Sequence, residues 1–361
     1  MPYPTATIDL SALQHNYNIV KQYAPSAKVA AMLKANAYGH GAVQVAKALD
    51  AADAFAVARV EEAMELRDND ITKRIVTMAG FLDAEELQIC VEYNIDVVIH
   101  SHWQLDLIDA LSSASLNIWL KVDTGMGRLG FTPEEFEDVY ARVKACKQIN
   151  EMIILTHFPD ADDISKPTTD RQVKAFHDLV NHLPEAKSLA KSAGIIAFPD
   201  SHCDWVRPGL MLYGVSSVNH KTTADLNLKP VMTLRSKVIS TRTLPEGHNV
   251  GYGGTYVCPE AMPIAVIACG YGDGYPRSAP LGTQVLVNGH RAVLIGRVSM
   301  DSIVVDIRGC GEVKAGDEVV LWGNDLPAEE IAKAAGTIAY ELFCRLTKRV
   351  KFVYKGLGIR A

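Results

Sequence analysis

The sequence predicts an α/β fold in which an N-terminal (β/α)8 barrel of the TIM type is followed by a mainly β C-terminal domain. From residue 11 to about residue 217, short apolar runs alternate with longer amphipathic runs. That order indicates a parallel sheet, and its many repeats favour a closed barrel. After about residue 225 the apolar runs are short and separated by Gly, Pro and Asn, which is typical of a β domain. We therefore expect a barrel over residues 1–225 and a β domain over residues 226–361.

The barrel strands are expected where a run is apolar on both sides, since strands of a parallel sheet are buried on both faces. Such runs cover residues 28–33, 74–78, 96–100, 117–122 and 152–157. Helix-length segments lie between them, among them residues 11–24 and 83–94. Asp83 is expected to cap the second of these helices, because acidic residues fill the turn that follows it.

In the second domain, short strands are expected between turn signals. They cover residues 231–241, 263–270, 283–289, 291–298 and 302–307. Two helical segments, 328–336 and 339–349, then precede a strand-like end at residues 350–356.

The composition argues against several classes of function, among them nucleic-acid binding and membrane association. The net charge of −6 and the absence of a basic run interleaved with aromatics argue against nucleic acid as a partner. The seven cysteines are scattered without a C-x-x-C pair, which fits reduced thiols in the cytoplasm, and no metal is predicted. The first residues lack a signal-peptide pattern, and no run approaches the ~18 apolar residues that span a bilayer, so no membrane association is expected.

Lys34 stands out because it follows an apolar strand directly and precedes the turn-rich segment "ANAYGHG". In a barrel, the catalytic groups lie at the carboxyl ends of the strands. Most lysines are solvated surface charges, but a desolvated lysine has a lowered pKa and is the usual nucleophile for Schiff bases with carbonyl cofactors.

Three other segments of the barrel contain candidate functional residues, two of them at expected strand ends and one within an apolar run. The segment "KVDTGMGRLG" offers Lys121 and Arg128 in one glycine-rich loop, although alone it is equally compatible with a flexible turn. His157 follows a strand as well, and a lone histidine there is more often structural than catalytic. Arg207 lies in the apolar run "DWVRPGLMLYG", and it needs acceptors because a guanidinium cannot lose its proton.

The second half contains the Gly- and Tyr-rich segments "GYGGTY" and "GYGDGYPR", together with "GRVSMD" and "AYELFCRL". Such clusters often form turns with packed rings. They also let the backbone approach a ligand and supply tyrosine hydroxyls to it.

Taken together, the segments "KANAYGHG", "DTGMGRLG", "DWVRPG", "GYGDGYP" and "AYEL" resemble the alanine racemases, a fold-type III family that depends on pyridoxal 5′-phosphate (PLP). They occur in the family's order and span nearly the whole chain. The resemblance implies that Lys34 binds PLP covalently and that Tyr252 is the second catalytic base. It also implies a homodimer, in which Tyr252, Met300 and Asp301 of one subunit complete the active site of the other.

The resemblance assigns further residues to the cofactor and the substrate. Tyr38, Ser192, Tyr340 and the backbone of Gly209 and Leu210 are expected to hold the phosphate. Arg207 is expected to face the pyridine nitrogen, and His157 to lie against the cofactor. Arg128 is expected near the cofactor phenolate and the substrate carboxylate, positioned by Lys121, which is carbamylated in many members of the family that the chain resembles. Tyr271 with Tyr340 is expected to narrow the entrance, and Asp162, Arg277 and Arg297 to line an outer access corridor.

Racemisation removes the α-proton on one face and returns a proton on the other, so two bases on opposite faces suffice. By resemblance, Lys34 serves the D-alanine face and Tyr252 the L-alanine face. The implied product is D-alanine for peptidoglycan, or L-alanine for catabolism. Three alternatives remain open at this point: a racemase of broader specificity that includes serine, a non-catalytic PLP-binding protein, and a fold-type III decarboxylase.

Overall fold

The computed structural model describes residues 4–112 and 115–356. The chain forms two compact units. The barrel unit comprises Gln14–Ala37 and Gly41–Leu228, and the β unit comprises Met1–Leu13, Tyr38–His40 and Lys229–Ala361.

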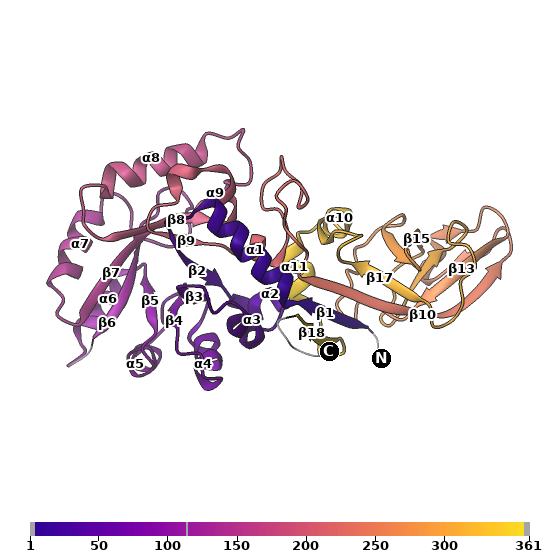
Figure 1. Ribbon diagram of the computed structural model, residues 1–361, viewed down its shortest axis with the longest axis horizontal. Helices are drawn as coiled ribbons and strands as arrows, with labels where there is room; N and C mark the ends of the chain where they lie inside the picture. Colours follow the sequence, from indigo (N-terminus) through magenta and orange to yellow (C-terminus); the bar gives the residue numbers. More distant parts are fainter. Residues whose placement is uncertain (1–3, 113–114, 357–361) are drawn as a thin grey trace. The chain divides into compact units, whose positions relative to one another are not determined.

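Within the described residues, eight parallel strands close into a barrel in chain order, as the sequence predicts (Figure 1). They are β2 (Lys28–Met32), β3 (Ala54–Val57), β4 (Arg74–Thr77), β5 (Asp96–Ile99), β6 (Leu116–Lys121), β7 (Ile149–Leu155), β8 (Ala186–Lys191) and β9 (Trp205–Arg207). The strands consist mostly of buried aliphatic residues, such as Val97, Val98 and Ile99 in β5. Burial on both faces therefore explains why the strands read as continuous apolar runs.

Helices connect the barrel strands and lie outside them (Figure 1). They are α3 (Ala42–Ala48), α4 (Val60–Asp68), α5 (Ala84–Glu92), α6 (His102–Asp109), α7 (Phe136–Ala145), α8 (Thr168–Val180) and α9 (Ser192–Ala197); α1 (Leu10–Tyr23) precedes β2. The expected cap of α5 is confirmed, because the carboxylate of Asp83 accepts a hydrogen bond from the amide of Glu86. Short 3₁₀ turns follow at η1 (Pro199–Ser201) and η2 (Leu210–Tyr213).

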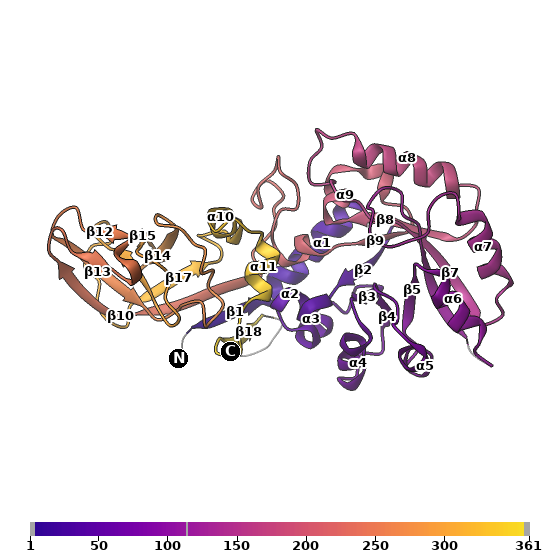
Figure 2. The same ribbon diagram turned by 180° about the vertical axis from the view of Figure 1, so that it is seen from behind.

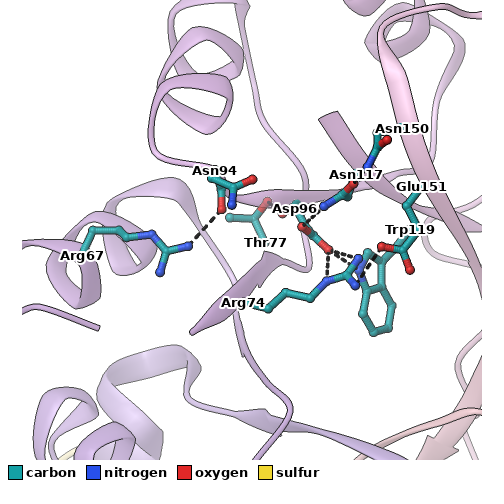
Figure 3. Close-up of polar contacts among 9 residues, drawn as sticks. All are labelled: Arg67, Arg74, Thr77, Asn94, Asp96, Asn117, Trp119, Asn150 and Glu151. Carbon is teal, nitrogen blue, oxygen red and sulfur yellow. Dashed lines mark hydrogen bonds and ion pairs between the residues drawn. The ribbon is translucent and has the colours of Figure 1, made fainter. Parts of the chain in front are cut away.

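A buried polar cluster lies at the amino ends of the barrel strands (Figure 3). Its centre is Asp96, which is 2% exposed and accepts hydrogen bonds from Arg74, Asn117 and Trp119. Arg74 also pairs with Glu151 at 2.9 Å. Because catalytic groups of such barrels lie at the opposite, carboxyl ends of the strands, this cluster is structural.

The β unit is built around one mostly antiparallel sheet in the order β13-β16-β15-β14-β17-β10-β1-β18 (Figure 2). The strand β13 also pairs with β10, so it has neighbours on both sides, β16 and β10. The strands are β1 (Thr5–Asp9), β10 (Met232–Leu244), β13 (Met262–Ile267), β14 (Gln284–Val287), β15 (His290–Ile295), β16 (Ile303–Asp306), β17 (Glu318–Trp322) and β18 (Lys351–Lys355).

Smaller elements complete this unit. They are β11 (Asn249–Val250), η3 (Tyr252–Gly254), β12 (Tyr256–Val257), α10 (Ala328–Ala334) and α11 (Ala339–Cys344). The first strand, β1, pairs with β10 antiparallel and with β18 parallel, so Thr5–Asp9 belongs to this sheet rather than to the barrel. In the part of the chain that the structure describes, no helix is both long and apolar enough to cross a bilayer.

Candidate active site

The backbone turns in an unusual way directly after Lys34. In α2 (Lys34–Gly39), Ala35, Asn36, Ala37 and Tyr38 have φ angles of +52° to +54°, so this turn is left-handed. A left-handed conformation costs roughly 1–2 kcal/mol for each residue with a side chain. Strain of this kind is retained where the surrounding structure holds it, and it concentrates at functional sites.

Hydrogen bonds on both sides hold this left-handed turn. The amide of Ala37 donates to the carbonyl of Leu33 at 2.7 Å, and the side chain of Asn36 accepts from the amide of Ala42 at 2.8 Å. The amide of Ala35 donates to the carboxylate of Glu62 at 2.6 Å. Lys34 is thereby fixed at the carboxyl end of β2, where the sequence places it.

A group of cations gathers at the carboxyl ends of the barrel strands. Lys121, the last residue of β6, is only 5% exposed. Burial, followed by the nearby charges of Arg128 and Arg207, lowers the pKa of Lys121 to about 8, and Lys34 adds to the same effect. Asp123 is the nearby anion that opposes the shift. The structure thus brings four of the predicted cationic residues into one electrostatic environment.

The same environment acts on His157, which follows β7. Burial lowers the pKa of His157 to about 2, and Arg207, Lys191, Lys121 and Arg128 add to the effect. The imidazole is therefore neutral at any working pH. Lys191, at the end of β8, also has a lowered pKa because of burial.

Arg207 is 2% exposed and makes an organised set of hydrogen bonds. Its Nη1 atom donates to the carbonyl and the hydroxyl of Ser188, and its Nη2 atom donates to the carbonyls of Thr156 and Leu189. These are the acceptors that a buried guanidinium requires. Among the described residues none of them is a carboxylate, so the positive charge of Arg207 is not neutralised by an adjacent anion.

The loop that carries Arg128 is organised by Asp123. Its carboxylate accepts hydrogen bonds of 2.7 to 3.2 Å from the amides of Gly125, Met126, Gly127 and Arg128. Burial raises the pKa of Asp123, but these amide bonds outweigh that effect and lower it overall. Arg128 itself is exposed, so its guanidinium is open to a ligand while its backbone is held.

The remaining predicted barrel residues lie around Ser192, at the start of α9. The Ser192 hydroxyl accepts from the amide of Gly209 at 2.8 Å and from the amide of Met211 at 3.4 Å. Leu210 begins η2 between them. Asp162 lies on the loop after β7, where its carboxylate accepts from the side chain of Asn219 at 3.4 Å.

In the β unit, Tyr252 projects from η3 and is 70% exposed. Gly251 and Gly253 flank it with φ angles of +68° and +74°. A Cβ atom on Gly253 would lie 3.3 Å from Nη1 of Arg297, so glycine allows the guanidinium of Arg297 to approach this turn closely. The structure therefore groups Tyr252 with Arg297, whereas exposed Arg277 lies on another loop.

A second cluster in the β unit holds Tyr271 beside Met300. The amide of Tyr271 donates to the carbonyl of Ser299 at 3.0 Å, and the amide of Gly272 donates to the carbonyl of Met300 at 2.8 Å. Arg349 joins the two loops, because its guanidinium pairs with Asp273 and with Asp301. Tyr271, Met300 and Asp301 are all exposed on this surface.

Tyr38 and Tyr340 make direct ring contact in the β unit, with ring centroids 5.3 Å apart. Burial, and then the proximity of Tyr340, raises the pKa of Tyr38, so its hydroxyl stays protonated. The next residue is Gly39, where a Cβ atom would lie 2.3 Å from the carbonyl oxygen of Phe343. Only glycine fits there.

Comparison with known proteins identifies the family. The family model "Alanine racemase, N-terminal domain" matches residues 8–217, and "Alanine racemase, C-terminal domain" matches residues 231–354. The chain belongs to the alanine racemase family. Its members are PLP-dependent amino-acid racemases, which are isomerases.

Alanine racemases from other organisms match the chain over nearly its whole length. The alanine racemase of Aliivibrio salmonicida is 47% identical over 98% of this chain and 99% of its own. The crystal structure of the biosynthetic alanine racemase from Pseudomonas aeruginosa has a TM-score of 0.96 at 43% identity, with 99% and 100% coverage. The Bartonella henselae alanine racemase, solved with covalently bound pyridoxal phosphate, has a TM-score of 0.90 at 32% identity, with 98% and 100% coverage.

Gln172 is a buried residue close to these groups that the sequence pattern does not single out. It lies on α8, is 2% exposed, and donates from Nε2 to the Thr124 hydroxyl and to the carbonyl of His157. Its local sequence, "TTDRQVKAF", reads as an ordinary amphipathic helix. Asp123 is a similar case. In the sequence it is one acidic residue within a glycine-rich segment, and its hydrogen bonds to the loop amides are not apparent there.

Proposed function

We propose that this chain interconverts L-alanine and D-alanine with PLP bound covalently to Lys34. The observation that carries the proposal is the position of Lys34 at the carboxyl end of β2, directly before a strained left-handed turn and near the buried cations Lys121 and Arg207. A strand-end lysine in such a setting is suited to nucleophilic attack on a carbonyl group.

The charge at the strand ends fits the phosphate of PLP. Arg128, Lys191 and Arg207 supply positive charge, and His157 is held neutral. Among the described residues, the amide of Leu210 donates no hydrogen bond, and the Ser192 hydroxyl lies beside the neighbouring amides. These groups can receive phosphate oxygens. Tyr38 keeps its proton and, with Tyr340, is proposed to donate to the same phosphate.

Arg207 fits the pyridine nitrogen of PLP. Both terminal nitrogens of its guanidinium already donate to oxygen atoms of the barrel. Among the described residues, its Nε–H has no acceptor and is therefore available to the ring nitrogen. Because arginine cannot take up a proton, it stabilises the unprotonated nitrogen.

When bound, PLP withdraws electron density from the α-carbon of the substrate and so makes its proton acidic. The chain supplies the two bases. We assign to Lys34 Nζ the proton on the D-alanine face, and to the Tyr252 hydroxyl of the partner subunit the proton on the L-alanine face. Arg128 is assigned to the substrate carboxylate, because its guanidinium is exposed and its loop is held by Asp123.

We further propose a homodimer in which the β unit of each subunit completes the active site of the other. The support is the exposure of Tyr252, Met300 and Tyr271, whose exposed fractions in the single chain are 70%, 52% and 38%. Large side chains at these exposures are suited to an interface. Tyr271 and Met300 are assigned to narrow the space for the substrate methyl group. Asp162, Arg277 and Arg297 are assigned to the access corridor.

The deciding experiment is to load the protein with PLP, add L-alanine and follow its optical rotation. We expect the rotation to decay to zero, as in a racemic mixture. L-Serine in a parallel reaction measures the breadth of the substrate range, and release of carbon dioxide would identify a decarboxylase. Binding of PLP without any of these reactions would contradict the proposal and indicate a PLP carrier.

A further inference from the structure

We propose that Gln172 and Thr124 form a polar bridge that positions Arg128 relative to His157 and Arg207. The bridge consists of the side chains of Gln172, Thr124 and Thr156. Its effect on substrate affinity rests on the proposed function of Arg128. Its structural part is independent of that function.

The bridge begins on α8. Gln172 Nε2 lies 3.3 Å from the hydroxyl of Thr124 and 3.2 Å from the carbonyl oxygen of His157. One amide group therefore contacts both the loop that carries Arg128 and the backbone of His157. The side chain of Gln172 also packs against Gly125, where a Cβ atom would lie 3.5 Å from its Cγ atom.

The bridge continues from Thr124 toward Arg207. The hydroxyls of Thr124 and Thr156 are 2.8 Å apart. The carbonyl of Thr156 accepts from Nη2 of Arg207 at 2.6 Å. A displacement of Thr124 is thereby transmitted through adjacent hydrogen bonds to the guanidinium of Arg207.

A glutamine at position 172 would be unfavourable if the side chain only filled space in the core. The side chain is buried, yet within the described chain its Oε1 atom accepts no hydrogen bond. A buried polar atom without a partner is unfavourable, and a leucine at this position of an amphipathic helix would avoid it. The two hydrogen bonds of Nε2 are what a glutamine supplies here and a leucine does not.

The bridge also complements Asp123. The carboxylate of Asp123 holds the amides from Gly125 to Arg128 and so defines the shape of the loop. It does not attach that loop to α8 or to β7. Gln172 makes this attachment, and its loss should let the loop move, so that the amides held by Asp123 open to solvent more often.

The test uses Gln172→Leu, which keeps the volume and removes both hydrogen bonds, and Thr124→Val, which removes the hydroxyl that links them. Each variant should raise the KM for alanine about tenfold, while kcat falls by less than about threefold, because a displaced arginine weakens substrate binding. Combined with Arg128→Lys, Gln172→Leu should add little further loss, since both act through the same guanidinium.

The matched control is Gln104→Leu. Gln104 is also a fully buried glutamine on a barrel helix, and its amide bonds to the backbone of His100 and Phe81. Its replacement should lower the thermal midpoint to a similar extent as Gln172→Leu, with the KM within about twofold of the unmodified enzyme. If Gln172→Leu does not fold, the KM and kcat of Thr124→Val test the proposal instead.

Hydrogen exchange of the amides from Gly125 to Arg128 is a readout that does not depend on activity. We expect about tenfold faster exchange there in Gln172→Leu and unchanged exchange in Gln104→Leu. An unchanged KM, fully multiplicative losses with Arg128→Lys, or unchanged exchange would each overturn the proposal. If the unmodified protein does not racemise alanine, the proposed function fails, and the exchange measurement still decides whether Gln172 holds the loop.

Discussion

The Nη2 atom of Arg207 lies 2.6 Å from the carbonyl oxygen of Thr156. Together with the bonds to Ser188 and Leu189, this contact fixes the plane of the guanidinium. Burial lowers the pKa of Arg207 to about 10, which still leaves it protonated at neutral pH. The group is therefore a rigid donor.

Replacement of Arg207 by glutamate should slow racemisation and raise the share of turnovers that end in pyridoxamine phosphate. A carboxylate opposite the pyridine nitrogen would keep it protonated and make the ring a stronger electron acceptor, which favours side reactions. Chromatography of the cofactor after many turnovers measures that share. Arg207→Lys keeps the cation and should keep the share low. A glutamate variant that binds PLP and shows no change would refute this electronic role.

Lys34→Ala should abolish racemisation and the visible absorbance of covalently bound cofactor. Lys174→Ala is the control, because Lys174 lies on the surface of α8 and pairs with Asp178. Absorbance spectra and alanine turnover of both variants check the prediction. Lys121 and Lys191 also end barrel strands, so a Lys34→Ala protein that keeps its colour and activity would move the assignment to one of them.

Tyr252→Phe should slow exchange of the α-proton of L-alanine far more than that of D-alanine, because only one face loses its base. Mixing Lys34→Ala and Tyr252→Phe subunits tests the dimer. Each hybrid dimer has one intact site, and hybrids form half of the dimers at equal mixing, so about a quarter of all sites should recover. Absence of recovery after verified subunit exchange would indicate a site built within one chain.

The barrel could be predicted because its strands are buried on both faces and read as apolar runs. The strand β9 has only the residues Trp205–Arg207, and β3 contains two alanines in Ala54–Val57, so neither differs locally from a helix or loop. The parallel pairing of β1 with β18 joins the two ends of the chain. Local patterns carry no information about such a distant partner.

Within the candidate site, Lys34 and Arg207 could be singled out because a charge after or within an apolar strand is conspicuous. The left-handed turn at Ala35–Tyr38 could not, since alanine and tyrosine do not favour that conformation. Gln172 was missed for another reason. A glutamine in an amphipathic helix usually faces solvent, and its burial follows only from the packing of α8 on the loop after β6.

Lys121 is expected to carry a carbamate, formed when its neutral amine adds carbon dioxide and releases a proton. With a pKa of about 8, about half of the amine is neutral at pH 8 and about 1% at pH 6, whereas an ordinary lysine near 10.4 is below about 1% neutral at both. The resulting anion would pair with Arg128. A ¹³C carbamate signal from ¹³C-labelled bicarbonate should therefore grow from pH 6 to pH 8 and be absent in Lys121→Ala. A signal that persists in that variant would exclude Lys121.

Asp96→Ala should destabilise the barrel by about 1–3 kcal/mol without altering the chemistry at the other end of the strands. The Asp96 carboxylate accepts from Arg74 at 2.5 Å and from the indole of Trp119 at 3.0 Å. Its removal leaves the buried indole N–H without an acceptor, while Arg74 keeps its pair with Glu151. Asp109→Ala is the control, because Asp109 pairs with Arg142 near the surface and such pairs contribute about 0–1 kcal/mol. Urea unfolding of both variants gives the free energies of unfolding, and the KM for alanine checks the site. Because the Asp96 cluster lies at the amino ends of the strands, a large change in KM with little loss of stability would show that it serves the site rather than the fold.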